Sequence, residues 1–281
     1  MGLPPSLHLL LAFLFGWGKF WVCIQVGGLA CSFYHRSIGG SEMSNPLIIA
    51  LDVPDLVSVR RILDLTAESA DIFKIGKQLF TAEGPAAIQL VRSYGNLVFL
   101  DLKFHDIPNT VAEAVKSAIR HDVWMLNVHI AGGEEMMKAA RTAVPDATPL
   151  LVGVTVLTSM NDDQWQEVFG ENAFSIPEQV VRMARLAQLC RLDGVVASPQ
   201  EIVPIREACG RDFIIVTPGI RPTWAATNDQ ARVMTPGEAV RLGADYLVIG
   251  RPITAADNPK DAARRILAEI EEARCDMKGS S

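Results

Sequence analysis

The sequence lacks the short motifs that mark several large enzyme classes. It contains no Walker phosphate loop, no GxGxxG pattern after a strand, no HExxH zinc motif and no GxSxG nucleophile turn. Its five cysteines are odd in number and form no CxxC pair, so a zinc site is not indicated. These absences remove the usual support for triphosphatase, dinucleotide, zinc-protease and serine-hydrolase functions. The cysteine pattern favours a reducing compartment, and we expect a cytoplasmic protein.

Positive charge is also scarce. The net charge is -6 and the pI is near 5.4, which argues against a nucleic-acid-binding surface because such surfaces cluster Lys and Arg. A local pocket can still be basic, so small anionic ligands remain compatible with this composition. Hydrophobic residues make up 49% of the chain and charged residues 21%, which is typical of a globular protein with one large domain.

Residues 1–42 differ from the rest of the chain because they are apolar and almost uncharged. Lys19 is the one formally charged side chain in 3–33, and no Lys or Arg precedes Leu9, as a secretory signal would require. Glycines and Lys19 interrupt the run, so we expect no membrane-spanning helix. Translation is expected to begin at Met43, directly before the first strand. The alternative is a genuine but poorly ordered extension.

From residue 43 to 281, short apolar runs alternate with longer amphipathic segments, which predicts a parallel sheet covered by helices. The predicted strands are Leu47 to Leu51, Ile72 to Ile75, Leu97 to Leu102, Met125 to His129, Leu150 to Val156, Gly194 to Ala197, Phe213 to Thr217 and Tyr246 to Ile249. The predicted helices are Leu56 to Ser69, Gly84 to Tyr94, Pro108 to His121, Glu134 to Ala143, Pro177 to Cys190, Pro199 to Ala208, Thr235 to Leu242 and Lys260 to Ala273. Eight such units predict a single-domain (β/α)8 TIM barrel.

Charged residues gather where these strands end, which is the catalytic face of such a barrel. Asp101 and Lys103 are two apart in an extended segment, so both side chains should point to the same side, and Asp106 follows. Buried opposite charges rarely stabilise a fold, which favours a functional site over a solvated ion pair. The other residues at strand ends are Asp52, Lys74, His129, Thr158, Pro218, Gly250 and Arg251. His129 is interpreted as a packed histidine and not as a catalyst.

The segment 101–110, Asp-Leu-Lys-Phe-His-Asp-Ile-Pro-Asn-Thr, resembles the signature of the orotidine 5′-phosphate decarboxylase family of bacterial type. Six further segments agree with this family in order. They are Leu51 to Pro54, Phe73 to Gly76, Val156 to Ser159, Thr217 to Arg221, Asp229 to Val233 and Val248 to Ile253. The resemblance extends from Met43 to about Ala273.

This resemblance implies a cofactor-free and metal-free conversion of orotidine 5′-phosphate to uridine 5′-phosphate and CO2, the last step of de novo pyrimidine nucleotide synthesis. It implies that Lys74, Asp101, Lys103 and Asp106 form an alternating charge network, with Lys103 as the proton donor to C6. Asp106 and Ile107 are expected to reach the partner's site in a homodimer with shared active sites. Alternating signs would keep the network rigid and ionised.

The resemblance also assigns the substrate contacts. Arg251 and the amides around Gly250 are expected to bind phosphate, and Gln230 is expected to bridge phosphate and base from a closing loop. Thr158 and Ser159 should contact the base. The other assigned substrate-binding residues are Asp52, Lys74, Ile107, Thr110, Pro218 and Arg221.

Two alternatives remain open from the sequence. One is a barrel enzyme resembling 3-keto-L-gulonate 6-phosphate decarboxylase, which also has Asp-x-Lys-x-x-Asp but holds magnesium. Such enzymes have a glutamate at the end of the second strand, where this chain has Lys74, whose charge would repel the metal. The other is a non-enzymatic, membrane-tethered protein that uses residues 1–42 as an anchor.

Overall fold

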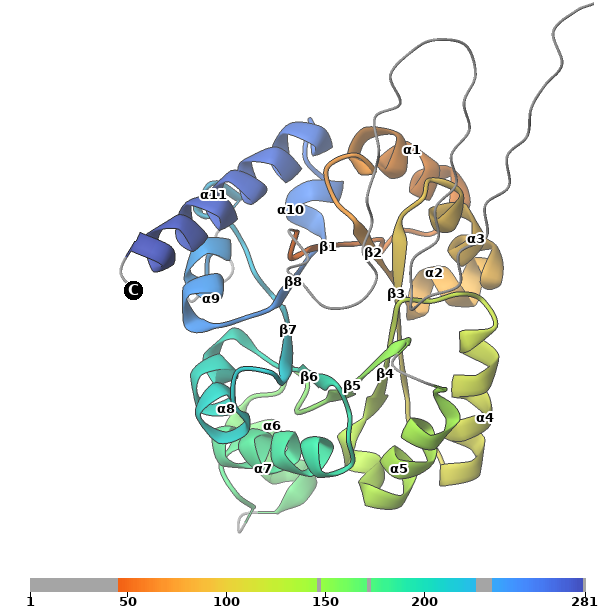
Figure 1. Cartoon of the computed structure of the whole chain (residues 1–281), viewed down its shortest axis with the longest axis vertical. Helices are drawn as coiled ribbons and strands as arrows, with labels where there is room; N and C mark the ends of the chain where they lie inside the picture. Colours follow the sequence, from red (N-terminus) through yellow and green to blue (C-terminus); the bar gives the residue numbers. More distant parts are fainter. Residues whose placement is uncertain (1–44, 146–147, 171–172, 226–233, 280–281) are drawn as a thin grey trace, which may run out of the picture. The chain divides into compact units, whose positions relative to one another are not determined.

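Eight parallel strands form a closed barrel in the computed structural model, which describes residues 45–145, 148–170, 173–225 and 234–279. Each strand pairs with its neighbour in chain order, and the eighth pairs with the first (Figure 1). The strands are β1 (Leu47–Ala50), β2 (Ile72–Gly76), β3 (Leu97–Phe104), β4 (Met125–His129), β5 (Leu150–Val154), β6 (Gly194–Val196), β7 (Ile214–Pro218) and β8 (Tyr246–Ile249). The predicted (β/α)8 barrel is therefore confirmed.

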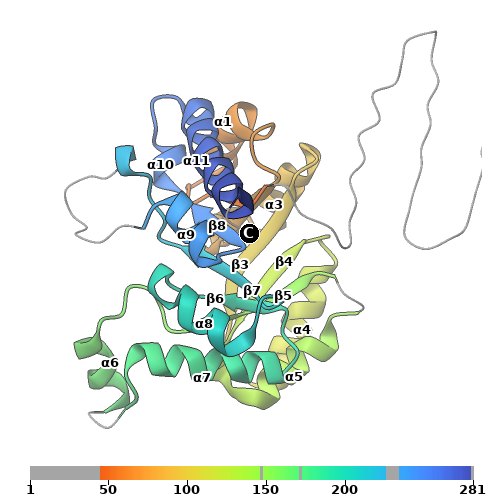
Figure 2. The same cartoon turned by 60° about the vertical axis from the view of Figure 1, so that its left-hand side comes forward.

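Helices surround this barrel, and both views place them outside the ring of strands (Figure 1 and Figure 2). The α-helices are α1 (Leu56–Thr66), α2 (Lys77–Glu83), α3 (Pro85–Ser93), α4 (Pro108–Ile119), α5 (Gly133–Ala143), α6 (Asp162–Phe169), α7 (Ile176–Leu189), α8 (Ile202–Cys209), α9 (Pro236–Leu242), α10 (Arg251–Thr254) and α11 (Pro259–Gly279). Short 3-10 turns are η1 (Ile130–Gly132), η2 (Pro199–Glu201) and η3 (Thr223–Ala225).

Local sequence signals set several helix starts. Pro108 and Pro236 stand at first helical positions, where an amide hydrogen would have no partner in the helix. Thr235 accepts a hydrogen bond from the amide of Glu238, whose carboxylate accepts one from the amide of Thr235. This capping box satisfies amide groups that the first turn leaves unpaired.

The barrel strands are buried on both faces, so two apolar layers result. One layer fills the barrel interior and the other lies between strands and helices. The interior layer consists of Ile48, Ala50, Ile72, Phe99, Met125, Val152, Val216 and Val248, with partly buried neighbours. Because side chains alternate along a strand, the residue two places further along each strand also faces inward. Residues near the carboxyl ends of the strands therefore also place alternate side chains toward the barrel axis.

The structure also corrects some predicted boundaries. Helices α2, α6 and α10 were not predicted, and the predicted helix from Pro199 to Ala208 is divided into η2 and α8. The predicted apolar segment 1–42 lies outside the described residues. Among the described residues, no helix is both long enough and apolar enough to cross a membrane.

Candidate active site

Because alternate side chains of each strand face inward, a layer of polar side chains lies next to the apolar interior, on the side of the carboxyl ends of the strands. Lys74 follows Ile72 by two residues in β2, and Asp101 follows Phe99 by two residues in β3. Asp52 comes two residues after Ala50 at the end of β1. The charged side chains therefore stand on a closed hydrophobic floor, which excludes water from below and strengthens their electrostatic interactions.

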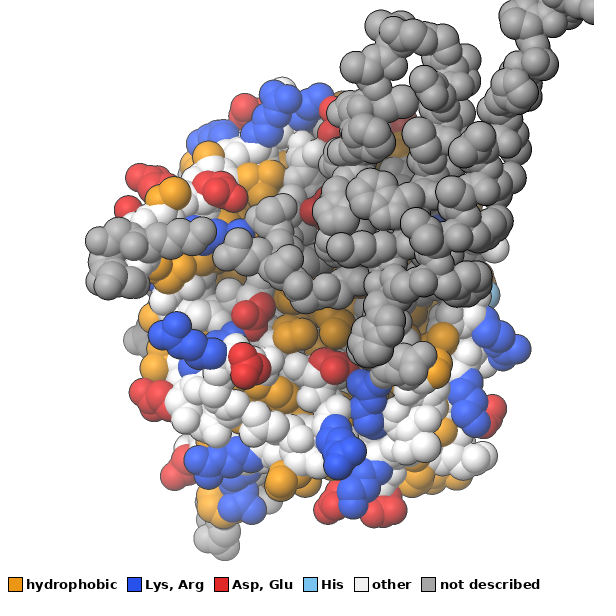
Figure 3. All heavy atoms as spheres, in the orientation of Figure 1, with side chains coloured by type: hydrophobic (Ala, Val, Ile, Leu, Met, Phe, Trp, Pro, Cys, Tyr) orange, Lys and Arg blue, Asp and Glu red, His pale blue; other side chains and the backbone are white. Residues whose placement is uncertain are grey.

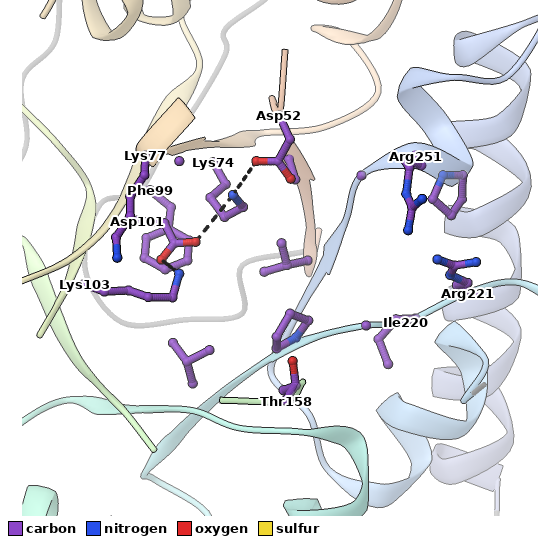
Figure 4. A pocket seen from close by; sticks show the side chains of 18 residues that line it. Asp52, Lys74, Lys77, Phe99, Asp101, Lys103, Thr158, Ile220, Arg221 and Arg251 are labelled. Atoms are coloured by element: carbon purple, nitrogen blue, oxygen red, sulfur yellow. Dashed lines mark hydrogen bonds and ion pairs between the residues drawn. The ribbon is translucent and has the colours of Figure 1, made fainter. Parts of the chain in front are cut away.

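Lys74, Asp101 and Lys103 form a continuous charge chain with Asp52 (Figure 4). Lys74 Nζ lies 3.0 Å from Asp52 Oδ1 and 3.4 Å from Asp101 Oδ2. Lys103 Nζ donates to Asp101 Oδ1 at 2.5 Å. The side chains of Lys74 and Asp101 are only 9% and 12% exposed, so each charge depends on its neighbours and not on water.

The carboxylate of Asp101 stays ionised in this setting. Burial alone would raise its pKa, but the ammonium groups of Lys74 and Lys103 and the Asn127 amide together hold the pKa below its usual value. The Asp101 carboxylate is therefore negatively charged near neutral pH and pairs with both ammonium groups. Gly76 makes room for this cluster, since a Cβ there would lie 3.0 Å from Lys74 Nζ and 3.1 Å from Asp52 Oδ1.

The backbone at Lys103 differs from the sequence-based expectation. Asp101 and Lys103 do meet, but Lys103 has φ 53°, in the left-handed region, and the β3–β4 register shifts between Leu100 and Phe104. Regular strand alternation is therefore not the reason for the contact. The side chain of Asn127 makes hydrogen bonds to this irregular part of β3. Its Oδ1 accepts from the Lys103 amide at 2.7 Å, and its Nδ2 donates to Asp101 Oδ1 at 2.7 Å.

A cavity of about 470 Å³ lies above the charge chain. Its lining includes Asp52, Lys74, Lys77, Phe99, Asp101, Lys103, Thr158, Pro218, Arg221, Gly250 and Arg251. In Figure 4 the charge chain of Asp52, Lys74, Asp101 and Lys103, the lysine–aspartate cluster, lies on one side of the cavity. Arg221 and Arg251 lie together on the other side. The cavity thus offers basic side chains at two separate places, an arrangement that suits a ligand with two anionic groups.

The arginine side of the cavity comes from the ends of β7 and β8. Gly219 has φ 79°, which a residue with a side chain rarely adopts, and this turn brings Arg221 to the cavity wall. Arg251 follows Gly250 at the start of α10. Over the described part of the molecular face, basic and acidic side chains are interspersed (Figure 3), whereas the cavity lining has five basic and two acidic side chains.

The remaining sequence-predicted residues lie elsewhere. Asp106, Ile107, Thr110 and Ser159 are exposed and do not line this cavity within one chain. The carboxylate of Asp106 accepts a hydrogen bond from the amide of Ile107 at 2.6 Å, which fixes the tip of the loop before α4. Gln230 lies outside the described residues.

His129 ends β4 but does not line the cavity. Its ring centroid lies 5.3 Å from that of His105. Burial, followed by the nearby charges of His105 and Lys77, lowers the pKa of His129 to about 4. The imidazole is therefore neutral near pH 7, as a packed histidine would be.

Sequence reasoning missed Asn127, Lys77 and Gly76. A signal for Asn127 was available, because it is the amide residue in the otherwise apolar stretch from Met125 to Val128. A fully buried amide needs hydrogen-bond partners, and a strand end beside Asp101 and Lys103 could supply them. Lys77 and Gly76 carried no comparable signal, since lysine and glycine are common at the start of a helix after a strand.

Comparison with known proteins agrees with this geometry. Residues 45–266 match the model of the family described as orotidine 5′-phosphate decarboxylase / HUMPS family. Orotidine 5′-phosphate decarboxylase of Moorella thermoacetica is 53% identical over 232 residues, covering 80% of this chain and 92% of that protein. The same-named protein of Geotalea daltonii is 53% identical over 234 residues, covering 82% of this chain and 97% of that protein.

A solved structure leads to the same conclusion. The crystal structure of orotidine 5′-phosphate decarboxylase from Lactobacillus acidophilus is 36% identical to this chain, with a TM-score of 0.70. The match covers 81% of this chain and 99% of that one. Fold, matched length and sequence identity agree, and this chain belongs to the orotidine 5′-phosphate decarboxylase / HUMPS family.

Proposed function

We propose that this chain decarboxylates orotidine 5′-phosphate to uridine 5′-phosphate and CO2, and that Lys103 delivers the proton to C6. One observation carries this proposal. The charge chain Lys74–Asp101–Lys103 lies on one side of the cavity, and two arginines lie on the other, Arg221 and Arg251. A substrate with a phosphate at one end and a carboxylate at the other fits this division of charge. The names of the relatives support the same substrate.

The chemistry requires a cation at the reacting carbon. When the C6–carboxylate bond breaks, its electron pair stays on C6 in an orbital outside the ring π system, so resonance cannot spread the charge. The ammonium of Lys103 is fixed by Asp101 and lines the cavity, where it opposes the developing negative charge. It then gives its proton to C6 and is reprotonated by water. Because the cluster is already ordered, little reorganisation accompanies the reaction.

Lys74 keeps the cluster together during this step. Its ammonium lies between the carboxylates of Asp52 and Asp101 and separates two like charges. Asp52, which is more exposed than Asp101, remains available for the ribose hydroxyl groups. Thr158 lines the cavity and is the candidate for a contact with the base.

The arginine side is proposed to bind the substrate phosphate. Arg251→Ala should raise KM by about 10²-fold, because a charge-assisted pair with phosphate contributes a few kcal/mol of binding. The value of kcat should fall much less, since Arg251 lies away from the lysine–aspartate cluster. Steady-state kinetics over a wide substrate range would measure both constants. An unchanged KM would contradict the phosphate role.

The reaction is proposed to need no metal ion. A divalent cation would have to be bound by Asp52 and Asp101, but Lys74 Nζ already lies within 3.4 Å of both carboxylates and would repel it. Purified protein treated with EDTA and dialysed should therefore release CO2 from orotidine 5′-phosphate at its untreated rate. Loss of activity with EDTA and its return with Mg²⁺ would instead support the magnesium-dependent alternative.

The active unit is proposed to be a homodimer in which each chain completes its partner's site. Asp106 and Ile107 stand exposed at the loop tip before α4, outside the cavity of their own chain, and Ile107 is an apolar side chain 66% exposed. An exposed apolar residue beside a carboxylate suits burial at an interface. In the partner's site, Asp106 would add a third carboxylate, after Asp52 and Asp101, and continue the alternation of charge beyond Lys103.

A further inference from the structure

Asn127 is a buried polar residue with no role yet assigned in the proposed mechanism. It is 0% exposed, and the residues before and after it in β4, from Met125 to Val128, are apolar. Because Met125 belongs to the barrel interior, Asn127 also faces inward, one layer higher. An amide in such a place is costly unless both its oxygen and its nitrogen find partners.

Asn127 finds both partners in the segment that carries the proposed chemistry. Its Oδ1 accepts from the Lys103 amide, and its Nδ2 donates to Asp101 Oδ1, each at 2.7 Å. The regular β3–β4 pairing shifts between Leu100 and Phe104, so one side chain substitutes for backbone contacts that the ladder does not make there. Asn127 thus connects the backbone of one charged residue to the side chain of the other.

The connection is made at a residue with an unusual backbone conformation. Lys103 has φ 53°, a left-handed conformation that residues with a Cβ adopt uncommonly. The Asn127 carbonyl oxygen holds the amide of Lys103 in that orientation. The Asn127 amide nitrogen shares Asp101 Oδ1 with the Lys103 ammonium, so Asn127 holds the backbone of the lysine directly and the partner of its ammonium through Asp101.

We propose that Asn127 is a positioning residue that aims the Lys103 ammonium at the reacting carbon by fixing the Lys103 backbone and the Asp101 carboxylate together. This inference rests on the proposed function. Asn127 does not line the cavity and so acts through the two charged residues. Its loss should therefore affect the reaction step and leave substrate capture by the arginines intact.

The first test is Asn127→Ala, assayed for CO2 release from orotidine 5′-phosphate. We expect kcat to fall by about 10²-fold, as misplacement of a reacting group by about 1 Å can cause, while KM stays within about threefold. Asn96→Ala is the matched control, since Asn96 is also a buried amide but bonds to the carbonyls of Ala67 and Ala70, away from the cavity. It should melt at a lower temperature yet keep its kcat.

The second test separates positioning from packing and does not require the alanine variant to fold. In Asn127→Asp the ionised acid keeps an acceptor for the Lys103 amide but repels Asp101, whereas the protonated acid restores the donor. Repulsion raises the pKa of one carboxyl of such a pair. The ratio of variant to wild-type kcat should therefore rise about tenfold as the pH falls from about 8 to about 6.

The outcomes are distinct. A reduced kcat in the alanine variant and a pH-dependent recovery in the aspartate variant support the positioning role. A wild-type kcat in folded Asn127→Ala, or a kcat ratio for Asn127→Asp that does not change with pH, overturns it. If the wild-type chain itself releases no CO2 from orotidine 5′-phosphate, the proposed function fails instead, so the two failures are distinguishable.

Discussion

Lys103→Ala should lower kcat by about 10⁴-fold or more, because it removes both the proton donor and the cation that opposes the charge on C6. The two effects act on the same step, so they appear together in kcat. Binding of phosphate should persist, since Arg221 and Arg251 lie on the other side of the cavity. The measurement is single-turnover CO2 release, together with inhibition by inorganic phosphate as a probe of the arginine side.

Two controls make this result specific. Lys260→Ala removes a lysine that pairs with Glu68 at an exposed position outside the cavity, and it should leave kcat unchanged. The thermal unfolding midpoint of Lys103→Ala should be similar to that of the wild type, because Asp101 keeps its contacts with Lys74 and Asn127 and the apolar interior of the barrel is unchanged. A near-normal kcat in the folded variant would refute the assigned role.

Mixing two inactive variants should restore activity if the sites are shared between chains. In a heterodimer of Lys103→Ala and Asp106→Ala, one site combines the intact Lys103 of one chain with the intact Asp106 of the other. Random exchange makes half of the dimers mixed, and one of two sites in each is intact, so about one quarter of wild-type activity is expected. The mixture would be equilibrated under conditions that allow subunit exchange and then assayed.

The matched control for this mixture is Lys103→Ala combined with the double variant Lys103→Ala/Asp106→Ala. That pairing has no intact Lys103 in any dimer, so it should show no recovery. The exposure of Asp106 and Ile107 outside their own chain's cavity is the structural reason to expect complementation. Absence of recovery in dimers shown to have exchanged would mean that Asp106 acts in its own chain or not in the reaction.

Much of the barrel could be predicted from the sequence because its strands are short, buried and continuous in hydrophobicity. The predicted ranges for β4 and β8 coincide with the observed strands, and both lie between clear turn or helix signals. Helix α6 could also have been found, since Asn161 and Gln164 form a capping box at its start. Helix α2 could not, because Gly76 provides no side-chain cap and the helix begins directly after β2.

The charged residues of the candidate site could be predicted, but the way they are held together could not. Asp101 and Lys103 were recognised from their spacing at the end of a strand, yet the predicted strand ended at Leu102 and assumed regular alternation. The left-handed Lys103 donates its backbone amide to Asn127, which lies 24 residues further along the chain. Such a tertiary contact overrides the local strand geometry, so the hydrophobic periodicity of β3 could not predict it.

The most direct test of the account is the reaction of purified wild-type chain with orotidine 5′-phosphate in D2O, followed by NMR. Lysine ammonium protons exchange with solvent, so proton delivery by Lys103 predicts uridine 5′-phosphate with deuterium at C6 and one CO2 for each product formed. The Lys103→Ala variant should give almost no product in the same time. Absence of product with the wild type, or an equal rate of deuterated product from Lys103→Ala, would contradict the account.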